Sequence, residues 1–190
     1  MVFVQSVCVL GKEVDSKIVL GNLDQVDLLL DRAEDLISRT STVSDPEEIA
    51  VNRAIFQTRR STALRERGRL HDALNLAKRA FSVLALTDEH TDVAILQVGM
   101  GICYLRLGRL EKAEEFFNDG LSTFRRIGHD LGVANLLNNL ALLQKIRCRW
   151  DRATALMDKA VELAHSIGAS HLLPGFYLNQ GIILQKIDRL

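Results

Sequence analysis

The side chains in this sequence that could support metal or acid–base chemistry are five histidines, and their spacing does not suit either task. They stand at His71, His90, His129, His165 and His171. A zinc site built on a helix needs two histidines one turn apart or a carboxylate at ligand spacing, and the sequence contains neither arrangement. We therefore expect no metal site and no cofactor.

The cysteines are equally unsuited to a structural or catalytic site. Cys8, Cys103 and Cys148 are odd in number, far apart and outside any C-x-x-C pair, which argues against a disulfide framework or a zinc site. No glycine-rich phosphate loop, nucleophile elbow or kinase signature occurs either. The sequence predicts free thiols, no catalytic residues and a protein that is not an enzyme.

The strongest concentration of charge is the segment "RRSTALRERGR" at residues 59–69. Its arginines are close enough to recognise a phosphate or an acidic helix, and Arg59 and Arg65 are the candidates for such an anion contact. The alternative is a hydrated helix face whose charge is neutralised by Glu66 and by acidic residues nearby.

The overall charge disfavours two classes of partner. Twenty-four Lys and Arg balance twenty-four Asp and Glu, so no large positive field attracts nucleic acid or anionic lipid. The apolar run "MVFVQSVCVLG" lacks the basic start and the cleavage site of a signal peptide and is too short to span a membrane. We expect a cytoplasmic protein that binds neither nucleic acid nor membrane.

The sequence repeats with a period of forty residues. The repeated turn reads Gly68-Arg-Leu70, Gly108-Arg-Leu110, Cys148-Arg-Trp150 and Asp188-Arg-Leu190. Small or apolar residues follow it at the same offsets, as Ala73, Ala113 and Ala153, then Ala77, Phe117 and Met157, then Ala80, Gly120 and Ala160. Spacings of three and four residues place these positions on one face of a helix, and each period therefore predicts two packed helices.

The expected helices follow from this period. The first helices of the repeats are predicted at 47–67, 92–107, 131–147 and 171–188, and the second helices at 70–87, 110–127 and 150–167. Asp45-Pro46 reads as a helix start, and Gly128 and Gly168 suit helix ends.

The N-terminal segment follows the period less closely. Leu23, Val26, Leu30 and Ala33 match the later second helices, which predicts a helix at 22–40. By the same logic residues 1–20 should hold a first helix, although "VFVQSVCVL" alternates like a strand. We expect one array over 1–190, divided into an irregular partial repeat at 1–45, repeats at 46–90, 91–130 and 131–170, and a half repeat at 171–190.

The pattern resembles the tetratricopeptide repeat family. The residues that carry the resemblance are those of the clearest repeat: Gly101, Tyr104, Gly108, Leu110, Ala113, Phe117 and Gly120. The resemblance implies an all-α fold, a right-handed superhelix of antiparallel helical hairpins whose first helices line a concave groove that binds peptides or protein segments. The forty-residue period is similar to arrays in bacterial signal-transduction and transcription regulators.

On the family's groove positions this sequence places an unusually apolar set. The residues expected to contact a partner are Ile95, Val98, Ile102, Leu105, Asn135, Asn138, Leu142, Lys145, Leu178 and Ile182. An exposed apolar patch of this size is normally covered, and an amphipathic helix or an extended peptide would cover it. The other reading is that neighbouring repeats bury part of it. The basic residues with which some members hold a carboxylate are absent here, because Thr58, Thr62, Gly99, Asn135 and Asn139 occupy those positions.

The sequence therefore predicts a protein- or peptide-binding module of a larger signalling or transcription-control protein. Two alternatives remain: a switch that senses a signal peptide, and a scaffold that forms a homodimer through the half repeat at 171–190. Because Asp188-Arg-Leu190 repeats a turn without the helix that should follow, the chain is also expected to be a fragment of a longer repeat protein.

Overall fold

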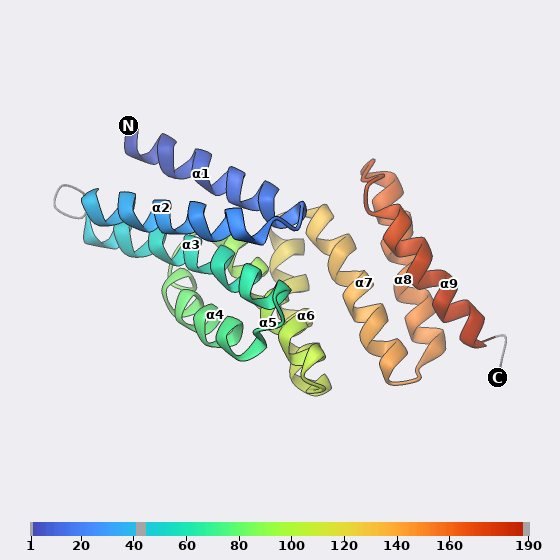
Figure 1. Cartoon of the computed structure of the whole chain (residues 1–190). Coiled ribbons are helices and arrows are strands. Elements are labelled where there is room, and N and C mark those ends of the chain that lie inside the picture. Colours follow the sequence, from blue (N-terminus) through green and yellow to red (C-terminus); the bar gives the residue numbers. More distant parts are fainter. Residues whose placement is uncertain (1, 41–44, 188–190) are drawn as a thin grey trace. The chain divides into compact units, whose positions relative to one another are not determined.

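A computed structural model describes residues 2–40 and 45–187, with side chains described for 9–39 and 45–187. These residues form helices only, joined by short turns (Figure 1). The helices are α1 (Val2–Val19), α2 (Leu23–Thr40), α3 (Pro46–Glu66), α4 (Leu70–Leu84), α5 (His90–Arg106), α6 (Leu110–Arg126), α7 (Asp130–Ile146), α8 (Trp150–Ser166) and α9 (Leu173–Ile187). The predicted all-α class and the eight helices from residue 22 onward are confirmed, with boundaries that differ by at most three residues.

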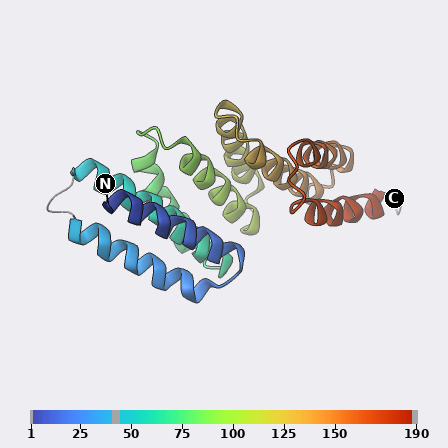
Figure 2. The same cartoon turned by 90° about the horizontal axis from the view of Figure 1, so that it is seen from above.

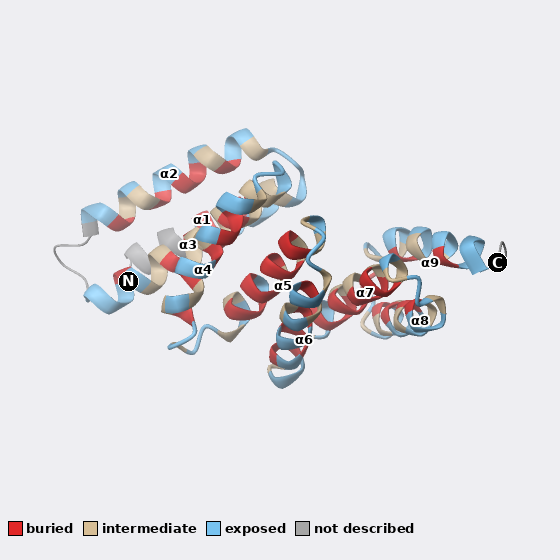
Figure 3. Ribbon diagram, turned by 90° about the horizontal axis from the view of Figure 1, so that it is seen from below, coloured by how far each residue is buried: buried red, intermediate tan, exposed pale blue. Residues whose placement is uncertain are grey.

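The chain divides into two compact units, residues 1–103 and 104–190, and the boundary falls near the end of α5. In the first unit α1, α2 and α3 run side by side, and α4 packs against α3 (Figures 1 and 2). In the second unit α7 packs against α6 and α8, and α9 lies against α8 and touches α7 (Figure 3).

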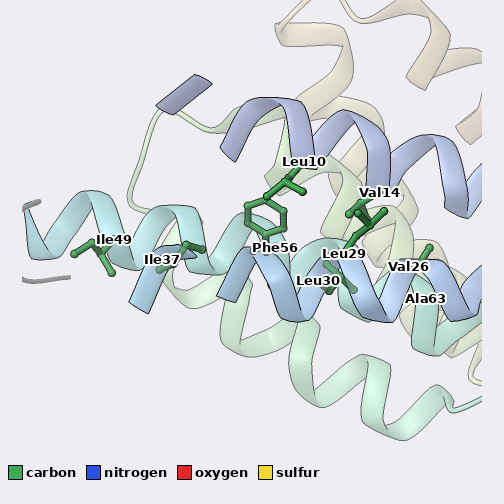
Figure 4. Close-up of a cluster of buried hydrophobic side chains, with 10 residues drawn as sticks. Leu10, Val14, Val26, Leu29, Leu30, Ile37, Ile49, Phe56 and Ala63 are labelled. Atoms are coloured by element: carbon green, nitrogen blue, oxygen red, sulfur yellow. The ribbon is translucent and has the colours of Figure 1, made fainter. Parts of the chain in front are cut away.

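The core of the first unit is built from one stripe on each of three helices (Figure 4). On α2 the buried residues Val26, Leu30, Ala33 and Ile37 follow the helical spacing of three and four. Leu10 and Val14 of α1 and Ile49, Phe56 and Ala63 of α3 meet this stripe. Burial of each large apolar side chain in this cluster contributes about 1.5–3 kcal/mol before chain entropy is counted.

Residues 2–19 form a helix and not the strand that the alternation in "VFVQSVCVL" suggested. The reason is visible further along the helix, where Leu10, Val14 and Ile18 are spaced four apart and pack against the core cluster. Both a helix and a strand would place residues four apart on one face. A strand also needs a second strand to pair with, and the described residues contain none.

The turn glycines end their helices as predicted. Gly128 and Gly168 have φ of 67° and 68°, the left-handed conformation of a Schellman motif. At the first of these turns the amide of His129 donates to the carbonyl of Phe124, 2.9 Å away. Cys148 occupies the same place with φ of 55°, which costs a residue with a Cβ about 1 kcal/mol relative to glycine. The period thus imposes a backbone conformation even where its glycine is missing.

The predicted start of α3 is also confirmed. Asp45 is the N-cap, and its carboxylate accepts a hydrogen bond of 3.0 Å from the amide of Glu47. Pro46 occupies the first turn, where its missing N–H is not needed. This cap fixes the first residue of α3, the helix that carries Arg59 and Arg65.

Candidate functional site

In the first unit the predicted contact residues lie on one face of α5. Ile95 is 41% exposed, and Val98 and Ile102 are half-buried. The opposite face of the same helix carries the buried residues Ala94, Leu96, Met100 and Cys103. α5 is therefore apolar on both sides, with one side buried and the other partly exposed.

In the second unit the predicted residues come from three helices. Leu105 at the end of α5 and Leu142 and Lys145 on α7 are half-buried. On α9, Leu178 is 66% and Ile182 38% exposed. The sets on α7 and α9 are neighbours, because these helices are in contact and a side-chain hydrogen bond joins them. In the second unit the exposed part of the predicted set therefore lies on α9, and the part on α5 and α7 is half-buried.

The predicted asparagines already make bonds within the fold. The side-chain amide of Asn135 donates to the carbonyl of Leu131 on its own helix, at 3.1 Å. The side-chain oxygen of Asn138 accepts from the amide nitrogen of Asn179, at 2.9 Å, and so ties α7 to α9. Each of these two amides keeps some bonding capacity, since an amide offers two N–H donors and one oxygen with two lone pairs.

Arg59 is held by an acidic partner from another helix. Its Nε and Nη2 donate to the two carboxylate oxygens of Asp15 on α1, both at 3.0 Å. The guanidinium also lies 5.6 Å from the ring centre of Phe56. A Cβ at Gly11 would come within 3.2 Å of Nη2, and the glycine therefore leaves room for the arginine to cross α1. Nε and Nη2 of Arg59, the pair of donors that could hold an anion, are therefore already bonded to Asp15.

Arg65 likewise pairs with a carboxylate and lies close to a glycine of another helix. Its Nε and Nη2 lie 3.1 and 2.9 Å from Oε1 of Glu66. A Cβ at Gly99 on α5 would come within 3.1 Å of Nη1 of Arg65. Both arginines that sequence analysis offered as anion contacts therefore have carboxylate partners, and each crosses a helix at a glycine.

Sequence reasoning missed Asp15 and Asp92, which join Arg59 at a pocket in the first unit. Oδ1 of Asp92 lies 4.0 Å from Nη1 of Arg59. Burial raises the pKa of Asp92 from its ordinary value, and the nearby Arg59 charge only partly opposes this. The Asp15–Arg59 pair is separated by 44 residues, close to one repeat, so a search for opposite charges one period apart could have found it.

In the second unit the main electrostatic cluster has a structural role. Nη1 of Arg147, the C-cap residue of α7, donates to Glu114 on α6, and the side-chain amide of Gln144 donates to the same carboxylate at 3.1 Å. Burial raises the pKa of Glu114, but the hydrogen bond and charge of Arg147 outweigh it and leave the pKa below its usual value. The cluster stabilises the α6–α7 packing of neighbouring repeats.

The described residues contain no group of three or more His, Cys, Asp or Glu side chains placed to hold a metal ion. Within that same part of the chain, no helix is both long and apolar enough to cross a membrane. Neither Cys103, which is buried, nor Cys148, which is exposed, takes part in a disulfide.

Several solved structures have a similar arrangement of helices. The structure is similar to that of BtubC from P. vanneervenii, with a TM-score of 0.70 and 18% identity over 90% of this chain and 69% of the other. It is also similar to aspartyl phosphate phosphatase F from Bacillus subtilis, with a TM-score of 0.78 and 12% identity over 97% and 47%. A third match is the Rap conjugation gene regulator of plasmid pLS20 in complex with a Phr peptide, with a TM-score of 0.66 and 16% identity over 92% and 52%.

The chain spans about half the length of the last two proteins, and no curated protein matches it in sequence. The family model for the tetratricopeptide repeat matches residues 52–126. These residues contain the clearest repeat of the sequence, with Tyr104 and Phe117 buried and Gly108 at positive φ. Residues 52–126 thus match the tetratricopeptide repeat family, and the repeat pattern and helical hairpins of the rest of the described chain are similar to those of such repeats.

Proposed function

We propose that this chain is a non-catalytic module that binds a peptide or an apolar helix of another protein on the exposed face of its first helices. Ile95, Val98 and Ile102 supply contact area in the first unit, and Leu105, Leu142, Leu178 and Ile182 in the second. The observation that carries the proposal is α5, whose Ile95 is exposed and whose Val98 and Ile102 are only half-buried, although the rest of the helix is largely buried.

We further propose that the module is the regulatory part of a larger bacterial signalling or transcription-control protein. Its support is the similarity in fold to a Rap regulator that was solved with a peptide. Asn135, Asn138 and Lys145 would orient the bound chain, because amides and an ammonium group can bond to peptide carbonyls. A signal peptide that binds two conformations of the array with different affinity would make the module a switch.

Replacing Val98 and Ile102 together with aspartate is expected to weaken partner binding at least about tenfold, because two charges would have to be desolvated against an apolar ligand. The measurement is the affinity of wild type and variant for peptides selected on the wild type from a displayed library of random short sequences. Circular dichroism checks that helicity is retained.

Leu86→Asp is the matched control, since Leu86 is a large apolar residue of the same unit that is fully exposed after α4. It should bind as wild type does. If the double variant loses helicity, Ile95→Asp takes its place, because Ile95 is already 41% exposed. Unchanged affinity in a folded variant at Val98 and Ile102 would remove the basis of the proposal.

A second candidate function is self-association through α9. Tyr177 and Leu184 are 48% and 44% exposed, whereas Leu137 and Gln144, at the same repeat positions on α7, are each 5% exposed. The hydroxyl of Tyr177 lies 2.7 Å from Nε2 of His165 on α8, so that helix covers part of the tyrosine, whereas Leu184 remains exposed. Two copies that paired these faces would form an isologous dimer.

Light scattering over a concentration series tests this candidate. If α9 mediates a dimer, the mass should rise towards twice the monomer value with concentration, and Leu184→Glu should suppress the rise. The control is Leu86→Glu, an apolar-to-acidic change at another exposed site. A monomer at every concentration, or a dimer that Leu184→Glu leaves intact, would exclude this role of α9.

A further inference from the structure

The first unit contains a pocket of about 210 Å³ between α1, α3 and α5. Its apolar wall is formed by Ile18 and Val19 of α1 and Ile95 of α5. Its polar wall is formed by Asp15, Arg59 and Asp92. A water molecule occupies about 30 Å³ of liquid, so the pocket has room for several, or for one extended side chain.

The charges of the pocket do not cancel. The single guanidinium of Arg59 faces two carboxylates and leaves a formal excess of one negative charge. Its bidentate bond to Asp15, with both distances at 3.0 Å, takes up the fork of Nε and Nη2. Its remaining nitrogen, Nη1, lies 3.4 Å from the carbonyl of Ile55 on its own helix. Asp92 therefore has the weaker interaction with Arg59, an ion pair at 4.0 Å.

The hydroxyl groups of the pocket do not compensate Asp92. Thr58 and Thr62 line the pocket, but their hydroxyls donate to the carbonyls of Ala54 and Thr58, at 3.0 and 3.2 Å. The ion pair of Asp92 with Arg59 spans 4.0 Å, which is beyond hydrogen-bond distance.

Asp92 is also removed from most of the solvent. Its side chain is 17% exposed, against 54% for Asp15, and burial raises its pKa. A partly buried carboxylate whose ion partner lies 4.0 Å away is only weakly compensated, and a cationic donor that entered the pocket would stabilise it. The apolar wall adds a surface for an aliphatic stem, which is how long basic side chains are usually held.

We propose that this pocket receives a basic side chain of a bound peptide, with its ammonium or guanidinium group between Asp92 and Asp15 and its aliphatic stem against Ile18, Val19 and Ile95. The inference rests on the proposed function and adds to it the charge of the ligand. It also reverses the expectation from the arginine-rich segment, because Arg59 serves to hold the carboxylates in place and does not face an anion.

The pocket fits an organic cation better than a metal ion. Arg59 already places a fixed positive charge beside both carboxylates, and three of the eight lining residues are aliphatic. A divalent metal prefers several oxygen ligands and a polar shell. A lysine or arginine needs only one or two acceptors and gains from the apolar wall.

The test uses two probes on the whole chain. The first is N-acetyl-arginine amide, followed by NMR of labelled isoleucine and valine methyl groups. The second is a series of capped synthetic peptides, selected as above, in which the residue nearest the pocket is arginine, lysine, leucine or glutamate. Asp92→Asn removes the charge with little change of shape, and Asp88→Asn is the matched control, because Asp88 is an exposed aspartate in the turn before α5.

The arginine probe should shift the methyl signals of Ile18, Val19 and Ile95 saturably in wild type and in Asp88→Asn, and the shifts should be lost in Asp92→Asn. Peptides with arginine or lysine should bind about tenfold more tightly than those with glutamate, and Asp92→Asn should remove the preference.

The outcomes separate the two proposals. Peptides that bind without a basic preference, or whose preference survives in Asp92→Asn, overturn the assignment of the pocket and leave the proposed function standing. A preference for glutamate overturns it in favour of an anion at Arg59. Saturable methyl shifts without any peptide binding support the pocket and count against the proposed function. No shift and no binding overturn both.

Discussion

Phe117→Ala is expected to lower the free energy of unfolding of residues 104–190 by about 3–5 kcal/mol. Phe117 on α6 is 0% exposed and is the largest fully buried side chain of the unit. Its removal would leave a cavity that the surrounding helices can close only in part, so the loss exceeds the transfer free energy of the ring. Urea titration followed by the fluorescence of Trp150, the one tryptophan and a residue of the same unit, measures it.

The neighbouring aromatic residue supplies the control. Phe116 is half-buried and stacks on Tyr104 with ring centres 5.4 Å apart, and Phe116→Ala should cost only about 1 kcal/mol. Phe117→Leu, which keeps most of the volume, should cost less than about 1.5 kcal/mol. Equal losses for Phe116→Ala and Phe117→Ala would show that the repeat period does not identify the core side of α6.

The fold could be predicted from the sequence because the same residue types recur at the same offsets. Ala113 and Ala153, forty residues apart, are both fully buried, and Phe117 and Met157 fill the same place in successive repeats. Each copy of the pattern supports the others, so the helix boundaries of the later repeats are accurate to one to three residues. The first helix lacked this support, since the described part of its stripe consists only of Leu10, Val14 and Ile18.

The candidate site could be predicted only in part. The period identifies which residues of α5 and α9 lie on first helices, and Ile95 and Leu178 are indeed exposed there. It does not say which partner a polar side chain finds. Asn138 bonds to Asn179, 41 residues away in sequence, and Arg59 bonds to Asp15, 44 residues away. These pairs depend on side-chain length and on how closely the helices approach. The burial of Asp92, whose side chain is 17% exposed, has no signal in the sequence.

Close approach is also invisible in the sequence, and two helical glycines of the second unit make it measurable. Gly132 lies in the first turn of α7 and Gly181 in α9. A Cβ at Gly132 would lie 2.7 Å from Cγ and Cδ1 of Phe124 and 2.8 Å from Nδ1 of His129. A Cβ at Gly181 would meet nothing within 4 Å. The same substitution should therefore have opposite effects at the two positions.

Gly132→Ala is expected to lower the free energy of unfolding of the second unit by about 1–3 kcal/mol, although alanine is the better helix former. Phe124 is buried and stacks on His129 at 5.1 Å, and Nδ1 of His129 accepts the amide of Gly132 at 2.9 Å, so the ring and the cap resist displacement together. Gly181→Ala, as the matched control, should raise the free energy of unfolding by up to about 1 kcal/mol. Trp150 fluorescence in urea measures both variants. Stabilisation by Gly132→Ala would mean that Phe124 and His129 move aside at little cost, and that α7 begins without the contact that now fixes its first turn.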